Sequence, residues 1–221
     1  MHPGKRAAAA AALELVPHGA PIGIGSGSTV DVFVALLAER PGLVEAAVAA
    51  SSATEARLRE ARIDVLDLNA TGELALYVDG ADEADGALRL IKGGGAALTR
   101  EKVVAGASAR FACLVDESKR VERLGAFGVP VEVVPMARSF VARRIVELGA
   151  DPEYREGTRT DNGGVILDCH GFEIDDPEAL EAALNAIPGV IANGLFAARG
   201  ADVLLVGDAA GGVSSVAAPG R

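Results

Sequence analysis

The sequence predicts an α/β fold in which a mostly parallel sheet is covered by helices on both faces. Apolar stretches such as residues 74–78 (LALYV) and 110–115 (RFACLV) have the continuous hydrophobicity of strands that are buried on both sides. Segments with helical character alternate with these stretches over the first half of the chain, as in βαβ units. Half of the 221 residues are hydrophobic, which is enough for a sizeable core. We therefore expect a Rossmann-like open sheet.

The first half of the chain begins with an Ala-rich helix at residues 5–16, which Pro17 and Gly19 end. A short strand at residues 21–24 then enters the glycine-serine turn GSGST, residues 25–29. The elements expected after this turn are a helix at 30–40, a strand at 46–51, a helix at 54–61, strands at 64–68 and 74–78, a helix at 97–107 and a strand at 110–115.

Residues 127–199 differ in character and predict a smaller α+β domain, inserted into a first domain that consists of residues 1–126 and 200–221. The expected elements are a Pro-bounded strand at 128–135, an amphipathic helix at 136–148, an Asn-Gly hairpin turn before a strand within 160–172, a helix at 177–187 opened by Asp176, and a strand or turn at 189–196. Residues 201–206 (ADVLLV) should return to the first sheet, and the tail at 209–221 should be frayed.

Composition excludes several classes of partner. The formal net charge of −10 argues against nucleic acid and anionic membranes, because both need a basic face. No window approaches ~18 uninterrupted apolar residues, so no membrane span is expected. Glu14 interrupts the apolar N-terminal run, which argues against a signal peptide. Cys113 and Cys169 lie in apolar strands, as reduced thiols of a cytoplasmic protein do.

Metal and cysteine chemistry are also not expected. His2, His18 and His170 are scattered and have no metal-ligand spacing. His170 follows Cys169 at a strand end, which is an ordinary neighbour pair rather than a nucleophile with its base.

The GSGST turn favours an anion site. Strand, glycine-rich turn and helix together direct free backbone N–H groups and a positive helix end at a ligand, and Ser28 and Thr29 add hydroxyl donors. A dinucleotide motif would need glycine where Val30 stands, and a P-loop would need a lysine that is not there. The sequence therefore favours a monophosphate site, with an ordinary tight βα turn as the alternative.

Residues 77–102, the central stretch, bring four chemically active side chains into a short span. Asp79 and Asp82 share a glycine-containing turn. Lys92 precedes three consecutive glycines, and Glu101 lies in the first turns of the next helix. A carboxylate base beside acidic partners and a cation suits abstraction of a proton next to a carbonyl group. The alternative is a solvated acidic turn followed by an exposed helix start.

Five segments carry a resemblance to a known family: IGIGSGSTV, YVDGADEAD, IKGGGAALTREK, PVEVVPMARS and NGLFAARGADVLLVG. Together they resemble ribose-5-phosphate isomerase of the A type, in the right order and over most of the chain. The resemblance implies interconversion of ribose 5-phosphate and ribulose 5-phosphate in the non-oxidative pentose phosphate pathway. It further implies a cis-enediolate intermediate, no metal or organic cofactor, and a homodimer or homotetramer.

The same resemblance implies a role for each matching residue. Glu101 becomes the base that moves the proton between sugar carbons 1 and 2. Asp79 helps to open the furanose ring, while Asp82 and Lys92 orient the substrate and stabilise the enediolate. The implied substrate-binding residues are Ser26, Gly27, Ser28, Thr29, Gly80, Ala81, Gly93, Gly94, Gly95, Lys119 and Lys5. Ser26 replaces a threonine that is common in the family and keeps its hydroxyl donor.

Two other functions stay open on sequence grounds. A non-catalytic module that senses sugar phosphates would need only the GSGST site and not the acid–base set. A coenzyme A transferase would use Glu101 as a nucleophile. Turnover of ribose 5-phosphate and exchange with acyl-CoA distinguish these functions. A subunit contact is expected from residues 136–148 and from Leu195 and Phe196.

Overall fold

The computed structural model describes residues 3–218 and forms two compact units. Unit 1 consists of Met1–Ala81, Arg100–Arg120 and Ala201–Arg221, and unit 2 consists of Asp82–Thr99 and Val121–Gly200. The sequence assigned residues 82–99 to the first domain. They belong to unit 2 because their strands β4 (Glu83–Ala84) and β5 (Leu90–Ile91) form a small sheet with β11 (Leu195–Phe196).

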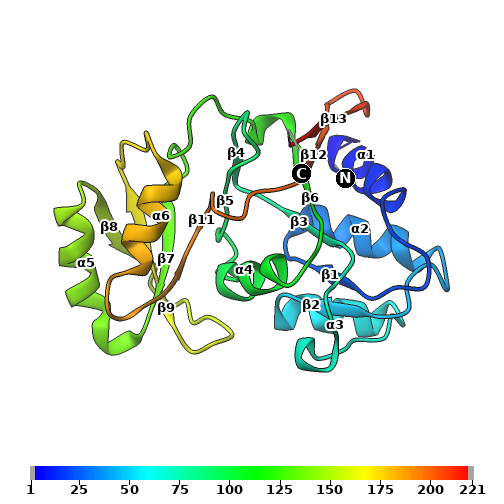
Figure 1. Cartoon of the computed structure of the whole chain (residues 1–221), viewed down its shortest axis with the longest axis horizontal. Helices are drawn as coiled ribbons and strands as arrows, with labels where there is room; N and C mark the ends of the chain where they lie inside the picture. Colours follow the sequence, from blue (N-terminus) through cyan, green and yellow to red (C-terminus); the bar gives the residue numbers. More distant parts are fainter. Residues whose placement is uncertain (1–2, 219–221) are drawn as a thin grey trace. The chain divides into compact units, whose positions relative to one another are not determined.

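Unit 1 is built on a six-stranded sheet with the order β13-β12-β6-β3-β1-β2 (Figure 1). Its strands are β1 (Ile22–Ile24), β2 (Ala47–Ala49), β3 (Tyr77–Gly80), β6 (Phe111–Asp116), β12 (Val203–Gly207) and β13 (Val213–Ala217). All neighbours pair in parallel except β12 and β13. The predicted α/β class and the return of residues 201–206 to the first sheet are thus confirmed.

Helices cover both faces of this sheet. They are α1 (Pro3–Leu13), α2 (Ser28–Ala38), α3 (Ser52–Glu60) and α4 (Leu98–Gly106). Successive residues of a strand point to opposite faces, so Ile22 and Ile24 share a core cluster with α1 and α2. Gly23 between them faces α4, where a Cβ would meet Val104 and the Tyr77 ring. Glycine at this position therefore lets the helix that carries Glu101 lie close to the sheet.

Two expected elements of unit 1 are wrong. Residues 64–68 make a single parallel bridge from Val65 to Ala47 rather than a strand, because Asp67 accepts a hydrogen bond from Asn69 N–H and starts the 3-10 helix η1 (Leu68–Ala70). The tail is not frayed over its described part. Residues 213–217 form β13 instead, because backbone pairing with β12 needs no apolar side chains at a sheet edge. Residues 219–221 of that prediction lie outside the described residues.

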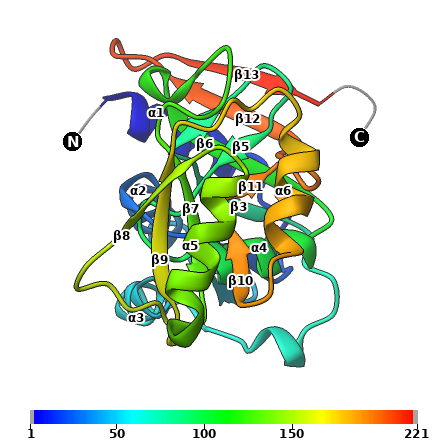
Figure 2. The same cartoon turned by 90° about the vertical axis from the view of Figure 1, so that its left-hand side faces the viewer.

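Unit 2 contains a four-stranded antiparallel sheet with the order β10-β7-β9-β8. Its elements are β7 (Val129–Val133), α5 (Arg138–Glu147), β8 (Asp151–Tyr154), β9 (Val165–His170), α6 (Pro177–Asn185) and β10 (Val190–Asn193). Helices α5 and α6 pack against one face, as Figure 2 shows. Asp176 caps α6 as predicted, accepting a hydrogen bond from Ala179 N–H at 3.0 Å.

The two faces of the unit 2 sheet differ in chemistry. On β7 and β9, residues such as Val131, Leu167 and Cys169 face the helices and form the core of the unit. The alternate positions carry the buried Glu132 and the partly buried Asp168. The core also contains Leu195, and Phe196 is equally buried, so the expected subunit contact through these two residues is wrong.

Within residues 3–218, no helix has both the length and the apolar character that crossing a membrane requires.

Candidate active site

The site in unit 1 lies at the carboxyl ends of three neighbouring parallel strands. Strand β1 ends at the GSGST turn, β3 ends at Gly80, and β6 is followed by the 3-10 helix η2 (Glu117–Lys119). In the sheet order these strands are adjacent as β6-β3-β1, so their carboxyl ends share one edge. This is the edge at which open α/β sheets bind ligands.

Asp79 is the buried anchor of this edge. The carboxylate is fully buried and accepts three hydrogen bonds within unit 1. Oδ1 accepts the backbone N–H groups of Ser26 at 2.9 Å and Gly80 at 2.7 Å, and Oδ2 accepts the Tyr77 hydroxyl. Three donors stabilise a buried carboxylate and fix its orientation.

Glu101 reaches the same edge from α4. It lies in the first turn of that helix, and its side chain is buried. The Ser26 hydroxyl donates a hydrogen bond to Glu101 Oε1 at 2.5 Å. Because the Ser26 backbone N–H also binds Asp79, this one residue connects two carboxylates that are far apart in sequence. The structure thus brings together Ser26, Asp79 and Glu101 of the predicted set.

Glycine is required at position 25 because the Asp79 carboxylate lies very close to its Cα. A Cβ built on it would overlap the Asp79 carboxylate, so no larger residue fits while Asp79 keeps its position. The Thr54 hydroxyl, at the start of α3, donates to the Gly25 carbonyl at 2.7 Å and fixes the turn from the other side. The first glycine of GSGST therefore makes room for a catalytic candidate.

Tyr77 is a member of the site that the sequence analysis did not select. It lies two residues before Asp79 on the same strand, so both side chains point to one face of the sheet. Burial raises the Tyr77 pKa well above its ordinary value, and the negative charges of Asp79 and Glu101 raise it further. The phenol therefore stays protonated and acts as a donor. The sequence signal for this residue is its position two residues before the aspartate at the end of the strand, which places both side chains on one face.

Replacing Tyr77 with Phe should change how stability depends on pH. The folded pKa is raised, so the stabilisation is complete below the unfolded pKa of about 10 and is lost as the pH rises towards the folded value. Above pH ~10 this group should lower the free energy of unfolding by up to about 1.4 kcal/mol per pH unit. Urea unfolding between pH 8 and 11 should therefore show the stability difference between wild type and Tyr77→Phe shrinking with pH.

The control for this experiment is Tyr154→Phe, which alters the tyrosine on β8. A difference between wild type and Tyr77→Phe that stays constant from pH 8 to pH 11 would contradict the buried hydrogen bond to Asp79.

The rest of the GSGST turn forms the N-terminus of α2. Gly27 occupies the cap position with φ of 95°, a backbone conformation that favours glycine. Ser28 and Thr29 are the first two helical residues, where backbone N–H groups have no partner within the helix. Lys5 Nζ on α1 donates to Ser28 Oγ at 2.8 Å, which brings a cation to this helix end. Lys119 lies on η2, beyond the carboxyl end of β6.

The remaining predicted residues belong to unit 2, except Ala81, which is the last residue of the first segment of unit 1. Lys92 is buried directly after β5, with its ammonium 5.5 Å from the centre of the Phe196 ring. Asp82 Oδ2 accepts the Gly94 N–H at 2.8 Å. Gly93 has φ of 111°, and Gly95 is exposed in the same turn.

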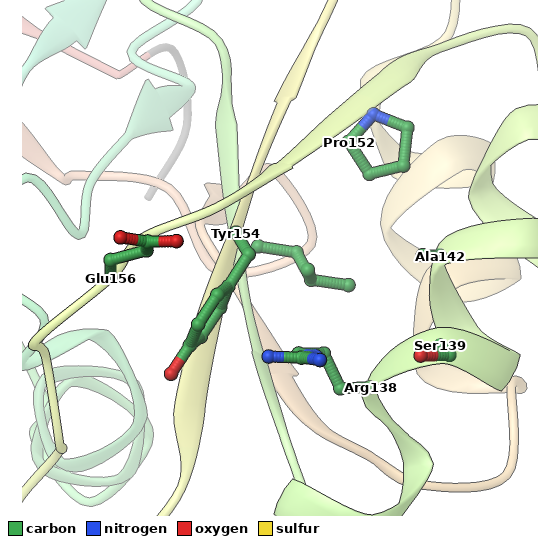
Figure 3. Close-up of a pocket in the computed structure, with 7 residues that line it drawn as sticks. Arg138, Ser139, Ala142, Pro152, Tyr154 and Glu156 are labelled. Carbon is green, nitrogen blue, oxygen red and sulfur yellow. The ribbon is translucent and has the colours of Figure 1, made fainter.

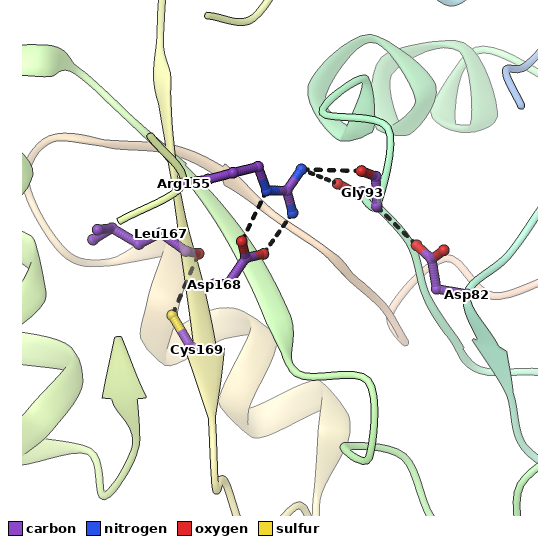
Figure 4. A network of polar contacts seen from close by, with 7 residues as sticks. Asp82, Gly93, Arg155, Leu167, Asp168 and Cys169 are labelled. Carbon is purple, nitrogen blue, oxygen red and sulfur yellow. Dashed lines mark hydrogen bonds and ion pairs between the residues drawn. The ribbon is translucent and has the colours of Figure 1, made fainter. Parts of the chain in front are cut away.

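Arg155 binds this glycine turn and Asp168 binds Arg155, and neither residue was predicted from the sequence. The Arg155 guanidinium binds the Asp168 carboxylate and donates to the carbonyl groups of Gly93 and Gly94 (Figure 4). An arginine 61 residues from its partner carbonyl leaves no local pattern in the sequence.

A separate pocket of about 300 Å³ lies in unit 2 beside α5 (Figure 3). It is lined by Arg138, Ser139, Ala142, Pro152, Tyr154, Glu156 and Leu167. The Arg138 guanidinium lies 4.4 Å from the centre of the Tyr154 ring, which is a cation–π distance. None of the predicted site residues lines this pocket.

Residues 3–218 contain no group of three or more His, Cys, Asp and Glu side chains that could bind a metal ion. His2 lies outside the described residues. Cys113 and Cys169 are buried and form no disulfide, and burial raises the Cys169 pKa, as does the nearby Asp168 charge.

Comparison with known proteins shows the same family that the sequence segments resemble. A family model, ribose 5-phosphate isomerase A (phosphoriboisomerase A), matches residues 46–211. The crystal structure of ribose 5 phosphate isomerase A from Neisseria gonorrhoeae has 44% identity and a TM-score of 0.95, covering 99% of this chain and 98% of that chain.

Two further solved structures are similar over nearly the whole length. Ribose 5-phosphate isomerase A from Methanocaldococcus jannaschii has 37% identity and a TM-score of 0.91, covering 96% of this chain and 97% of that chain. A D-ribose-5-phosphate isomerase in complex with phospho-erythronic acid has 38% identity and a TM-score of 0.93, with coverage of 96% and 97%. The match of the family model over most of the chain, with these identities, shows that the chain belongs to the ribose 5-phosphate isomerase A family.

Proposed function

We propose that Glu101 is the general base with which this ribose 5-phosphate isomerase moves a proton between carbons 1 and 2 of its substrate. The observation that carries the proposal is the Ser26 link, in which one residue binds both Glu101 and Asp79. A base needs a second group that handles the hydroxyl protons when the aldose becomes an enediolate. Asp79, fixed by three donors, is assigned that role and assists opening of the furanose ring.

Lys92 and Asp82 are assigned supporting roles in the same reaction. The buried Lys92 ammonium suits stabilisation of the negative oxygen that develops in a cis-enediolate, because a charge shielded from water acts more strongly. Asp82 orients the substrate and binds the Gly94 N–H. Gly93, Gly94 and Gly95, together with Gly80 and Ala81, are assigned to substrate binding through their backbone.

The phosphate group is assigned to the N-terminus of α2. Gly27, Ser28 and Thr29 provide hydroxyl and backbone donors there, and Lys5 provides a positive charge. Ser26 precedes them, and its N–H and hydroxyl bind Asp79 and Glu101. A helix N-terminus with a cation suits a phosphate, and this local attraction acts against the unfavourable net charge of −10. Lys119 is the second cation proposed for the substrate.

Replacing Lys5 with Gln should raise KM for ribose 5-phosphate by about tenfold and change kcat much less, because a charged hydrogen bond to the phosphate is lost in both ground and transition states. The control is Arg6→Gln, which removes an exposed positive charge from the same helix. Steady-state kinetics at two salt concentrations measure both variants. An unchanged KM for Lys5→Gln would exclude this lysine from the phosphate site.

The activity itself is tested by mixing the purified chain with ribose 5-phosphate and following the appearance of ketose. Turnover is expected without added metal or cofactor. Binding without turnover would indicate a sugar-phosphate sensor instead, and exchange with acyl-CoA would indicate a transferase.

We also propose that the chain forms a homodimer or homotetramer through the outer side of α5 and the residues before it. Large apolar side chains are exposed there, with Met136 94% and Phe140 42% accessible. Exposed apolar side chains in a group favour burial in a contact. Light scattering after gel filtration should give a mass above that of one chain, and Met136→Glu combined with Phe140→Glu should reduce it. Val213→Glu on β13 is the control, and a monomeric wild type would refute the proposal.

A cytoplasmic location is proposed as well. Cys113 and Cys169 are buried and form no disulfide, as is usual for proteins of a reducing compartment. Cell fractionation with an antibody against the chain tests it, and recovery in an oxidising compartment would contradict it.

A further inference from the structure

Arg155 makes an unusually complete set of hydrogen bonds for a residue outside the proposed reaction. It follows β8 directly, and its guanidinium binds both oxygens of Asp168, with Nε to Oδ2 at 2.8 Å and Nη2 to Oδ1 at 2.5 Å. The remaining nitrogen, Nη1, donates to the carbonyls of Gly93 and Gly94, each at 3.1 Å. Figure 4 shows the guanidinium between the carboxylate on one side and the glycine turn on the other.

Asp168 gives this arginine a fixed orientation. It lies on β9 directly opposite Pro130 of β7, on the face that does not bear α5 and α6. A two-point bond between a guanidinium and a carboxylate allows one relative geometry, and side-chain exposures of 20% and 23% shield this pair from water. The third side of the guanidinium is thereby directed at the glycine turn.

The glycine turn is bound from its amide side as well. Gly94 N–H donates to Asp82 Oδ2 at 2.8 Å, while the Gly94 carbonyl accepts from Arg155. A Cβ on Gly94 would approach Asp82 Oδ1 to 2.8 Å, so the turn and this carboxylate are in close contact. Immediately before the turn, the Lys92 N–H donates to the Gly194 carbonyl at 2.9 Å. A shift of the turn would therefore move the hydrogen-bond donor of Asp82 and the backbone that carries Lys92.

We propose that Arg155, oriented by Asp168, is a positioning residue that fixes the Gly93–Gly94 turn and thereby sets the orientation of Asp82 and Lys92. The inference rests on the roles proposed for Asp82 and Lys92 in the isomerisation. Arg155 itself is not a catalytic residue, because it acts through the turn.

An ion pair that only stabilised unit 2 would need no bonds to the turn. Arg155 could then satisfy Asp168 with two nitrogens and make no further bond. The exposed pair of Arg123 and Asp175 is local in this way, because Arg123 Nη2 lies 2.9 Å from Asp175 Oδ1 and Nε donates to the carbonyl of the adjacent Ile174 at 3.2 Å. The two carbonyl bonds connect β8 and β9 to a turn 61 and 62 residues earlier in the chain. This connection is what distinguishes a positioning role from a purely structural one.

The test measures kcat, KM, the fraction folded and amide hydrogen exchange in Arg155→Met, Arg155→Lys and Asp168→Asn. Arg155→Met should lower kcat by about 10- to 100-fold and change KM by less than about threefold, because misplacement of a reacting group affects mainly the transition state. Amide exchange at Gly94 should become faster. Arg155→Lys should not restore kcat, because an ammonium cannot bind a carboxylate at two points and also reach two carbonyls.

The double variant Arg155→Met with Asp168→Asn should be no slower than Arg155→Met alone, since both changes remove the same connection. Arg123→Met is the control and should keep wild-type kcat and wild-type exchange at Gly94. If Arg155→Met does not fold, Arg155→Lys and Asp168→Asn carry the same test.

A kcat for folded Arg155→Met that stays within about twofold of wild type, or unchanged exchange at Gly94, would overturn the inference. Full activity of Arg155→Lys would do the same. An inactive wild type would instead refute the proposed function, and the exchange at Gly94 would still show whether Arg155 fixes the turn.

Discussion

Glu101→Gln is expected to lower kcat for ribose 5-phosphate by about 10²–10⁴-fold, with a much smaller change in KM. Glutamine keeps the size of the side chain and can still accept the Ser26 hydroxyl hydrogen bond, but it cannot take up a proton. The substrate should therefore bind nearly as before, and the loss should fall on proton transfer. Steady-state kinetics in both directions of the reaction measure the effect.

The matched control is Glu55→Gln. Glu55 also lies in the first turn of a helix, α3, but it is partly exposed and pairs with Arg59 at 2.7 Å. Its replacement should leave kcat unchanged, so a loss confined to Glu101→Gln would not reflect a general effect on helix starts. A kcat for Glu101→Gln close to that of wild type would remove Glu101 from the role of base.

Gly25→Ala is expected to lower kcat/KM by about 100-fold. The added Cβ would overlap the Asp79 carboxylate, and that carboxylate has no free space because it is fully buried and accepts three hydrogen bonds. Either Asp79 or the end of β1 must shift. The same overlap should lower the free energy of unfolding by about 1–3 kcal/mol, measured by urea unfolding.

Gly72→Ala separates this close approach from a general effect of glycine replacement. A Cβ on Gly72 would meet no heavy atom within 4 Å, so the activity and stability of Gly72→Ala should stay near those of wild type. If Gly25→Ala were as active as Gly72→Ala, the position of Asp79 against the GSGST turn would not matter for the reaction.

The central strands of the unit 1 sheet could be predicted because they are buried on both faces and are therefore continuously apolar up to their carboxyl ends. Strand β6 (Phe111–Asp116) is the clearest case, since all six residues are buried. Strand β13 (Val213–Ala217) could not be predicted in this way, because an exposed edge strand is stabilised by backbone pairing with β12 and its side chains carry no apolar pattern. The assignment of residues 82–99 differs from the observed unit for a related reason, since β4 and β5 are two residues each, and β5 pairs with β4 and with the distant strand β11.

The residues of the candidate site likewise fall into those that could be selected from the sequence and those that could not. Asp79, Lys92 and Glu101 could be selected because carboxylates and a rare lysine stand at strand and helix ends, within a short span of sequence. Tyr77 was missed because a tyrosine inside an apolar strand looks like a core residue until its hydroxyl partner is known. Arg155 was missed because the carbonyl groups that it binds lie 61 and 62 residues earlier in the chain, and Asp168 was missed because its contact with the site runs through Arg155. The roles of all these residues remain predictions.

The central claim is that Glu101 moves a proton through an enediolate, and isomerisation in D₂O tests it most directly. Deuterium entering the carbon-bound positions at C1 and C2 is followed by NMR while the wild type and Glu101→Gln are held with ribose 5-phosphate through many turnovers. The wild type should incorporate deuterium steadily, because the carboxyl proton that Glu101 has taken from carbon exchanges with solvent while the enediolate is bound, and Glu101→Gln should not. Incorporation by Glu101→Gln at the wild-type rate would contradict the account.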